Sequence, residues 1–416
     1  MTALQPLEQQ RALLPDDRLA VVSAFGSIAE SEDLDIAFET IRGRLEALVG
    51  DVDFHASPLR EAWDLSDRAL GFTSRGLPRL AALRHKRQVV LYGPPGTGKT
   101  FEAKHLAERL IRYEAMQRWG VENYLRMRER LGEIVRAQVR RRQLHAGYSY
   151  EDFVVGLRVA ENGETEPYRG DLLQLIDEMR AARVTSPDPA PLPWVLILDE
   201  INRTDLSRLL GEAFSALDDR GAAIELPSVG GHRVDALKLP DDLYVIGTMN
   251  LIDQSVEQFD FALRRRFLWL WSGFRAEMIP QVLRERWEAM DRTQRPWLSR
   301  HPWDELAPDV MRLAERASAL NQAVDSSPLL GSDYELGHTY FFDVAEFIAD
   351  DPRLRFGSDG IGRYLWDEDG QPLGPLVDLW SHSLQPLLLE YLSGLDAVAR
   401  DRQMQELESV FLAPVG

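Results

Sequence analysis

Three short runs of mostly apolar residues dominate the hydrophobic pattern of the chain. They are RQVVLYG (87–93), WVLILDE (194–200) and LYVIGTMN (243–250). A strand that is buried on one face alternates apolar and polar residues, whereas a strand of a parallel sheet covered on both faces is apolar almost throughout. Segments with helical periodicity separate the three runs. The pattern therefore predicts an α/β fold with a parallel sheet.

Helical periodicity prevails before and after this region. The segment LDIAFETIRGRLEALV (34–49) has apolar residues at every third or fourth position, and the chain beyond residue 276 is mainly helical. A length of 416 residues is typical of two or three domains. We therefore expect a small N-terminal helical region (1–75), an α/β domain (76–275) and a C-terminal helical domain (276–416).

The composition narrows the class of protein. There are 67 acidic against 48 basic residues, which gives a formal net charge of -19 and argues against a surface coated with nucleic acid. The chain has no cysteine, which excludes disulfides and thiolate metal sites. The first residues lack the pattern of a signal peptide, and no stretch has the roughly 18 apolar residues of a membrane span. We expect a soluble, cytoplasmic protein without a membrane partner.

A glycine-rich turn joins the first apolar run to the next helical segment. Its residues are Gly93, Pro94, Pro95, Gly96, Thr97, Gly98, Lys99 and Thr100. They match the pattern G-x-x-x-x-G-K-[ST], in which backbone amides and a helix N-terminus bind phosphate. The Lys99 ammonium is predicted to contact the β- and γ-phosphates and the Thr100 hydroxyl to bind Mg²⁺. We expect ATP or GTP as the substrate. The turn does not distinguish between them, because it contacts the phosphates that both nucleotides share.

Polar residues end the other two apolar runs. Asp199 and Glu200 follow WVLIL, and burying adjacent carboxylates without partners would be costly. In a nucleoside triphosphatase the first carboxylate holds the Mg²⁺ shell and the second polarises the attacking water. Asn250 ends the third run, where a side-chain amide can orient the γ-phosphate and the water. A turn-capping role is the alternative for Asn250.

Two arginine-rich segments carry further candidates. FALRRRF (261–267) places three arginines between an apolar helix and the apolar strand FLWLW, so that it is either a basic turn or the source of an arginine finger for a neighbouring subunit. The stretch from Arg118 to Arg142 contains eight arginines. It predicts either a solvated helix with local ion pairs or a basic helix that lines a channel or meets an acidic neighbour.

Four segments together resemble the McrB-type GTPase subunit of McrBC modification-dependent restriction systems, which are ring-forming AAA+ proteins. They are YSYEDFVVG (148–156), LDEINRTDLSRLLGEAFSAL (198–217), IGTMNLIDQSVEQFDFALRRRF (246–267) and LGHTYF (336–341). The resemblance covers roughly residues 85 to 395.

The resemblance implies an AAA+ P-loop nucleoside triphosphatase domain followed by a helical lid, assembled as a hexamer with nucleotide at the subunit interfaces. It implies that Asn250 and Asp253 position the catalytic water, that Arg265 or Arg266 acts in trans, and that Arg203 lies at the interface. It also implies GTP as the usual substrate, an McrC-like nuclease as partner, and contact with DNA through that partner or the central channel.

The chain departs from the family at two places. The family motif Met-Asn-x-x-Asp-Arg-Ser is matched by Met249, Asn250, Asp253 and Ser255, but Gln254 replaces the arginine, which removes a planar cation. Only 92 residues precede Gly93, too few and too acidic for the separate reader of modified DNA found in many relatives. We expect DNA recognition to come from a partner, and we find no nuclease motif.

Two other classes of function are open at this point. A MoxR-like AAA+ chaperone, which remodels or activates a protein partner, would share the DEINR stretch, but the ALRRRF ending fits it less well. A scaffold that binds nucleotide without hydrolysing it is disfavoured by the joint presence of Lys99, Asp199, Glu200 and Asn250.

Overall fold

The computed structural model describes residues 34–414, except for 51, 55–58, 66–78, 160–162, 186–187, 232, 253–260 and 357–362. The chain divides into two compact units. One comprises Met1–Leu91, Thr100–Met249 and Ser255–Leu270, and the other comprises Tyr92–Lys99, Asn250–Gln254 and Trp271–Gly416. No helix among the described residues is long and apolar enough to cross a membrane.

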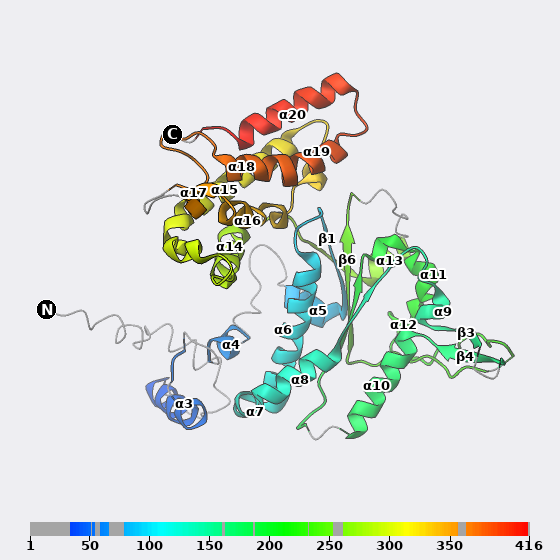
Figure 1. The fold of residues 1–416 in the computed structure, drawn as a ribbon. Helices are drawn as coiled ribbons and strands as arrows, with labels where there is room; N and C mark the ends of the chain where they lie inside the picture. The colour runs from blue at the N-terminus through cyan, green and yellow to red at the C-terminus, as the bar shows by residue number, and fades with distance from the viewer. Residues whose placement is uncertain are drawn as a thin grey trace. The chain divides into compact units, whose positions relative to one another are not determined.

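A five-stranded sheet in the order β2-β5-β6-β1-β7 organises the first unit (Figure 1). Its strands are β1 (Gln88–Gly93), β2 (Val139–Gln143), β5 (Trp194–Asp199), β6 (Leu243–Asn250) and β7 (Leu268–Trp271). The pairs β2/β5 and β5/β6 are parallel, with Val139 opposite Val195 and Trp194 opposite Leu243. The three apolar runs thus form β1, β5 and β6, and the α/β fold with a parallel sheet predicted from the sequence is confirmed.

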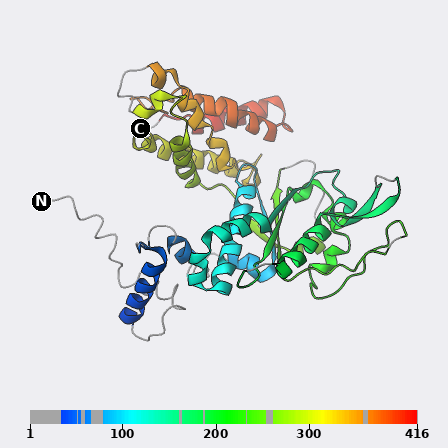
Figure 2. The same cartoon turned by 60° about the horizontal axis from the view of Figure 1, so that its bottom comes forward.

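Helices cover both faces of this sheet, which explains why its central strands are apolar throughout. Val195 and Ile197 of β5 share a core with Ala103 and Leu110 of α6. Successive side chains of a strand point to opposite faces, and Leu196 accordingly packs with Leu172 and Leu210 from the other helical layer. In Figures 1 and 2, α6 and α8 lie on one side of the sheet and α10 to α12 on the other.

Within the described residues, the region around this sheet also contains eleven α-helices and one hairpin. The helices are α3 (Leu34–Val49), α4 (Leu59–Asp64), α5 (Arg79–Lys86), α6 (Lys99–Trp119), α7 (Val121–Arg126), α8 (Arg128–Gln138), α9 (Tyr150–Phe153), α10 (Asp171–Thr185), α11 (Leu206–Leu210), α12 (Ala213–Ala216) and α13 (Phe261–Arg266). The antiparallel hairpin consists of β3 (Val155–Val159) and β4 (Thr165–Arg169). The helix predicted over 34–49 is α3.

The arginine-rich stretch corrects one expectation. Both sequence interpretations treated it as helical, but its last residues, VRRRQ, form the strand β2. Pairing with the buried strand β5 supplies the backbone hydrogen bonds that override the polar sequence. Local ion pairs of the expected kind are present, for example Arg130 with Glu133 and Arg126 with Glu122. Arg140, in contrast, pairs with the distant Glu178.

The second unit is helical apart from its short turns. Its helices are α14 (Met278–Ala289), α15 (Trp303–Ser326), α16 (Val344–Ala349), α17 (Pro352–Phe356), α18 (Gly374–Leu379), α19 (Gln385–Tyr391) and α20 (Ala397–Phe411). The longest, α15, buries Leu306, Val310, Leu313, Ala317, Leu320 and Val324. These positions are three or four residues apart, as an amphipathic helix requires. They pack with the fully buried Trp287, Trp366 and Trp380 in a separate core.

Candidate nucleotide site

The glycine-rich turn lies where the sequence predicts it, between a strand and a helix. β1 ends at Gly93 and α6 begins at Lys99. Gly96 and Gly98 have φ angles of 71° and 73°, a left-handed conformation that costs other residues energy. Two glycines in this conformation just before a 21-residue helix make a turn whose amides suit an anion.

Lys99 is folded onto the turn. Its side-chain nitrogen lies 3.1 Å from the carbonyl oxygen of Gly93 and 3.2 Å from Oγ1 of Thr97, and it also donates to the carbonyl of Pro94. Lys99 is 6% exposed. The ammonium is thus held by oxygens of the turn itself, and phosphate oxygens would exchange with these same acceptors.

Thr100 and Asp199 are joined directly. The Thr100 hydroxyl donates to Oδ1 of Asp199 at 2.8 Å, and the Thr248 hydroxyl donates to the same oxygen. Arg141 of β2 donates from Nε to Oδ2 at 3.0 Å. The carboxylate of Asp199, at the end of β5, is therefore buried with a donor on each oxygen.

This pair fits the chemistry of Mg²⁺. A hydroxyl and a carboxylate oxygen are hard ligands, and Mg²⁺ bound with a nucleotide takes few ligands from the protein because phosphates and water supply the others. No group of three or more histidine, cysteine, aspartate or glutamate side chains suited to a metal occurs within the described ranges. Thr100 and Asp199 would therefore hold the ion together with the substrate rather than as a preformed cage.

Glu200 is the next residue and has an unusual backbone. Its φ of 56° and ψ of 50° are left-handed, a conformation that costs a non-glycine residue about 1 kcal/mol or more. Its amide donates to Oγ1 of Thr248 at 3.1 Å. Its carboxylate accepts from Nε2 of Gln143 at 3.1 Å and forms an ion pair with Nε of Arg203 at 3.0 Å. The side chain is thereby held between two donors.

Sequence motifs do not identify three residues of this site: Arg141, Gln143 and Thr248. Arg141 and Gln143 belong to the unrecognised strand β2, where Gln143 lies opposite Asp199 in the register. Thr248 lies in the segment IGTMN, two residues before Asn250. A polar residue inside an otherwise apolar buried strand was the available signal for Thr248.

Asn250 ends β6, as predicted, and is half-buried. The amide of the following residue, Leu251, donates to the carbonyl of Gly93 at 3.2 Å. The chain just after Asn250 is therefore tied to the first residue of the glycine-rich turn. Asp253, with Gln254 and Ser255, lies outside the described residues.

The candidate arginines differ in their surroundings. Arg264 to Arg266 form the last turn of α13 rather than following it. Arg265 is exposed, whereas Arg266 is 7% exposed, pairs with Asp218 at 2.8 Å and lies over the ring of Phe214 at 3.8 Å. Arg203 has its ion pair with Glu200.

The YSYEDF segment has a structural role in the first unit. Ser149 and Asp152 form a capping box at the start of α9. The Tyr150 hydroxyl donates to Glu212 at 2.7 Å, and the Tyr148 hydroxyl donates to Asp171. Burial, followed by the hydrogen bond to Asp171, raises the pKa of Tyr148 well above its usual value. Both hydroxyls therefore stay protonated and act as donors at neutral pH.

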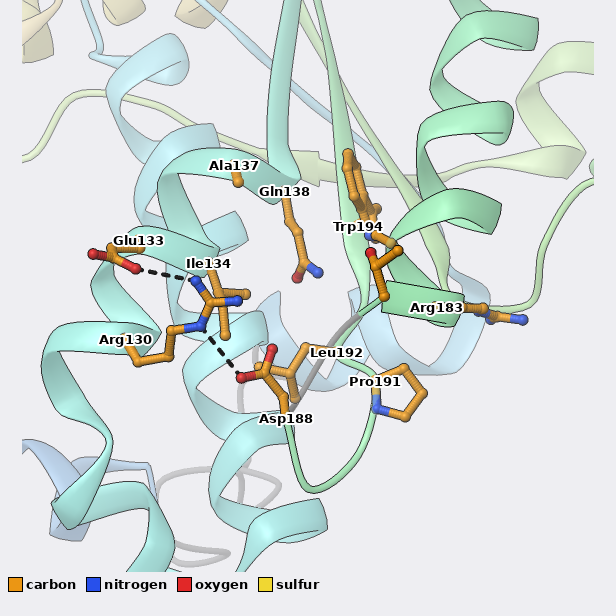
Figure 3. A pocket seen from close by; sticks show the side chains of 12 residues that line it. Arg130, Glu133, Ile134, Ala137, Gln138, Arg183, Asp188, Pro191, Leu192 and Trp194 are labelled. Carbon is orange, nitrogen blue, oxygen red and sulfur yellow. Dashed lines mark hydrogen bonds and ion pairs between the residues drawn. The ribbon is translucent and has the colours of Figure 1, made fainter.

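A separate hollow lies at the opposite end of β5. It has a volume of about 270 Å³ and is lined by residues of α8 and α10 with Trp194 (Figure 3). Figure 3 shows Arg130 between Glu133 and Asp188, and both ion pairs are within 3.3 Å. Trp194 begins the strand that Asp199 ends, so this hollow contains none of the predicted site residues.

Comparison with known proteins identifies the relationship. Residues 125–267 match the family model of the AAA domain (dynein-related subfamily). The chain is 28% identical over 268 residues to the type IV methyl-directed restriction enzyme EcoKMcrB subunit of Escherichia coli (strain K12), covering 63% of this chain and 49% of that protein. The chain is therefore similar to McrB-type AAA+ proteins.

The chain is also similar to a second restriction-system protein and to an ATPase. The type II restriction enzyme BsuMI component YdiS of Bacillus subtilis (strain 168) is 23% identical over 222 residues, which is 46% of this chain and 59% of that protein. A proteasome-associated ATPase of Mycobacterium tuberculosis (strain ATCC 25177 / H37Ra) is 33% identical over 114 residues, 26% of this chain and 18% of that protein. The McrB-like chain thus spans about half of the first relative and 59% of the second.

Proposed function

We propose that this McrB-like chain is a nucleoside triphosphatase, with GTP or ATP as substrate, and the motor subunit of a restriction or anti-phage defence complex of the McrBC type. The observation that carries the hydrolytic part is the arrangement at the end of β5. A buried Asp199 is bonded to the Thr100 hydroxyl, and the adjacent Glu200 is held by Gln143 and Arg203. The relationship to two restriction-system proteins supports the motor role.

The proposed roles follow from the donors and acceptors present. Lys99 and the amides of the turn bind the phosphates, and Thr100 with Asp199 holds Mg²⁺, which neutralises phosphate charge. Glu200 accepts a proton from the attacking water, for which its carboxylate must exchange the bonds to Gln143 and Arg203. Asn250 and Asp253 orient that water. Before substrate binds, the Glu200 carboxylate accepts a hydrogen bond from the neutral Gln143 and pairs with the charged Arg203.

A ring, which we propose to be a hexamer, would bring a neighbouring subunit to the site. Of the two candidate fingers we favour Arg265, because Arg266 is already committed to Asp218 and Phe214 of its own chain. An arginine that stabilises the transition state from outside must be exposed in the isolated subunit, as Arg265 is. The proposed partner is an McrC-like nuclease, which the motor drives along DNA.

The decisive experiment is a turnover assay with ATP and GTP side by side, with and without the product of the adjacent gene and DNA. Glu200→Gln should keep nucleotide binding but lose at least about 10²-fold in turnover, because the carboxylate that accepts the proton is gone. If the wild type hydrolyses neither nucleotide, the proposed function is wrong. A stimulating partner without nuclease or DNA dependence would favour a MoxR-like chaperone instead.

A further inference from the structure

The segment Gly337 to Tyr340 lies directly on the glycine-rich turn, within the second compact unit. The amide of Gly337 donates to the carbonyl of Pro95 at 3.2 Å. The amide and the hydroxyl of Thr339 both donate to the carbonyl of Gly96, at 3.0 and 2.8 Å. Three hydrogen bonds to two consecutive carbonyls fix this segment against the part of the chain that binds phosphate.

The contact is close enough to require glycines on both sides. A Cβ atom at Gly337 would lie 1.9 Å from the carbonyl carbon of Gly96. A Cβ atom at Gly96 would lie 2.3 Å from the ring of Tyr340. Both distances are far below van der Waals contact, so the segment and the turn approach each other as backbones. Their mutual position is therefore well defined.

This approach places the His338 ring beside the turn. His338 is 2% exposed, and its ring packs against Phe342 with centroids 5.8 Å apart. Its Nε2 atom would be 3.4 Å from a Cβ atom at Gly98, which is ordinary contact. Nε2 thus faces the residue that precedes Lys99, where the amides of such turns bind phosphate oxygens.

The other ring nitrogen indicates where the proton lies. Nδ1 is buried and has no hydrogen-bond partner within the described part of the chain. Burial, followed by the charges of Arg275 and Lys99, lowers the pKa of His338 to about 4, so the ring is neutral at pH 7. A neutral imidazole carries one proton, and a proton on Nδ1 would lack an acceptor. The favoured tautomer therefore has its N–H on Nε2, the atom that faces the turn.

The Nε2–H group of His338 would donate best to an acceptor with negative charge. Lys99 and Arg275 make the surroundings positive, and the oxygens that Lys99 contacts belong to the turn itself. We propose that His338 is a substrate-binding residue that donates a hydrogen bond from Nε2 to the polyphosphate of a nucleotide bound in the glycine-rich turn. This inference rests on the proposed nucleotide binding but adds a contact from the segment Gly337 to Tyr340.

The test measures binding rather than turnover. Fluorescent ATP and GTP analogues are titrated into the full chain and into His338→Ala, His338→Gln and His382→Ala, with inorganic triphosphate as competitor. His338→Ala should weaken binding by about tenfold or more, because a hydrogen bond to a charged group is lost. Glutamine can place an amide donor near the position of Nε2 and should recover most of the affinity. His382 is exposed and serves as the matched control.

A second measurement keeps the test independent of folding. In wild-type protein labelled with ¹⁵N-histidine, inorganic triphosphate should shift the Nε2 resonance of His338, which its absence in His338→Gln assigns. If the wild type binds nucleotide while His338→Ala binds equally well and the resonance does not move, this inference is wrong and the proposed function stands. If the wild type binds no nucleotide, the proposed function itself falls.

Discussion

Arg141 allows the electrostatics of the candidate metal site to be tested quantitatively. Its guanidinium donates to Oδ2 of Asp199, whose side chain is 3% exposed, and the Arg141 side chain is 39% exposed. Arg141→Gln keeps a polar side chain but removes the charge. The carboxylate then keeps its two hydroxyl donors on Oδ1 and loses the charged donor on Oδ2.

The size of the effect follows from the burial of the two partners. Removing one partner of a fully buried pair costs about 3–5 kcal/mol, and exposed pairs contribute at most about 1 kcal/mol. Arg141 is more than a third exposed, so water replaces part of what is lost, and we expect a loss of about 1–2 kcal/mol. Arg140→Gln is the matched control on the same strand. Its pair with Glu178 is exposed on both sides, and we expect less than about 1 kcal/mol.

The assay is urea denaturation in EDTA and again with Mg²⁺, without nucleotide. Because Arg141→Gln leaves Asp199 with an uncompensated charge, Mg²⁺ should stabilise this variant more than it stabilises the wild type. Equal stability of Arg141→Gln and Arg140→Gln in EDTA would refute the importance of the Arg141 pair. An equal response to Mg²⁺ would refute competition between the guanidinium and the metal for the same carboxylate.

Three other predictions concern the ring, the motif and pH. Mixing Arg265→Ala subunits with Lys99→Ala subunits should restore part of the turnover that each lacks alone, since one supplies the site and the other the finger; no recovery in rings shown to be mixed would contradict action in trans. Gln254→Arg should raise basal or partner-stimulated turnover if the missing cation limits the rate, and an unchanged rate would mean that it does not. Because His338 has a pKa of about 4 in the fold against about 6.5 when unfolded, the unfolded state binds more protons between these values. Stability should therefore be full above pH 6.5 and fall by up to about 3 kcal/mol towards pH 4, and urea denaturation of His338→Gln should lack this component.

The parts of the fold that were predictable are those where burial decides the residue type. β1, β5 and β6 lie between two helical layers, so nearly every position must be apolar and the strands stand out in the sequence. The turn from Gly93 to Thr100 was predictable for a different reason. Phosphate binding by backbone amides needs glycines at set positions, and this requirement is local in the chain.

β2 was not predictable by the same rule. Its sequence VRRRQ has no apolar run, because each arginine is satisfied by an acidic residue far along the chain: Arg140 by Glu178, Arg141 by Asp199 and Arg142 by Asp171. Such pairing depends on tertiary structure, which hydrophobic periodicity does not report. Missing β2 also meant missing Gln143 and hence its bond to Glu200, 57 residues away.

The arginines of α13 show a second limit. Three adjacent identical residues give no pattern by which to choose between them, yet successive helical residues point about 100° apart. One direction buries Arg266 against Phe214 and Asp218, and another leaves Arg265 exposed. The choice of finger thus comes from the surroundings of the helix.

Thr248 explains why β5 and β6 must act together at the candidate site. Its hydroxyl accepts from the amide of Glu200 and donates to the carboxylate of Asp199. One side chain of β6 therefore fixes the backbone of Glu200, the proposed base, and the orientation of Asp199, the proposed metal ligand. These two adjacent residues lie at the end of β5. The left-handed conformation of Glu200 is sustained by this bond, since the amide would otherwise lie buried near the sheet without a partner. Thr248, which no sequence motif identifies, thus links Asp199 and Glu200, the two acidic residues on which the proposed hydrolysis depends.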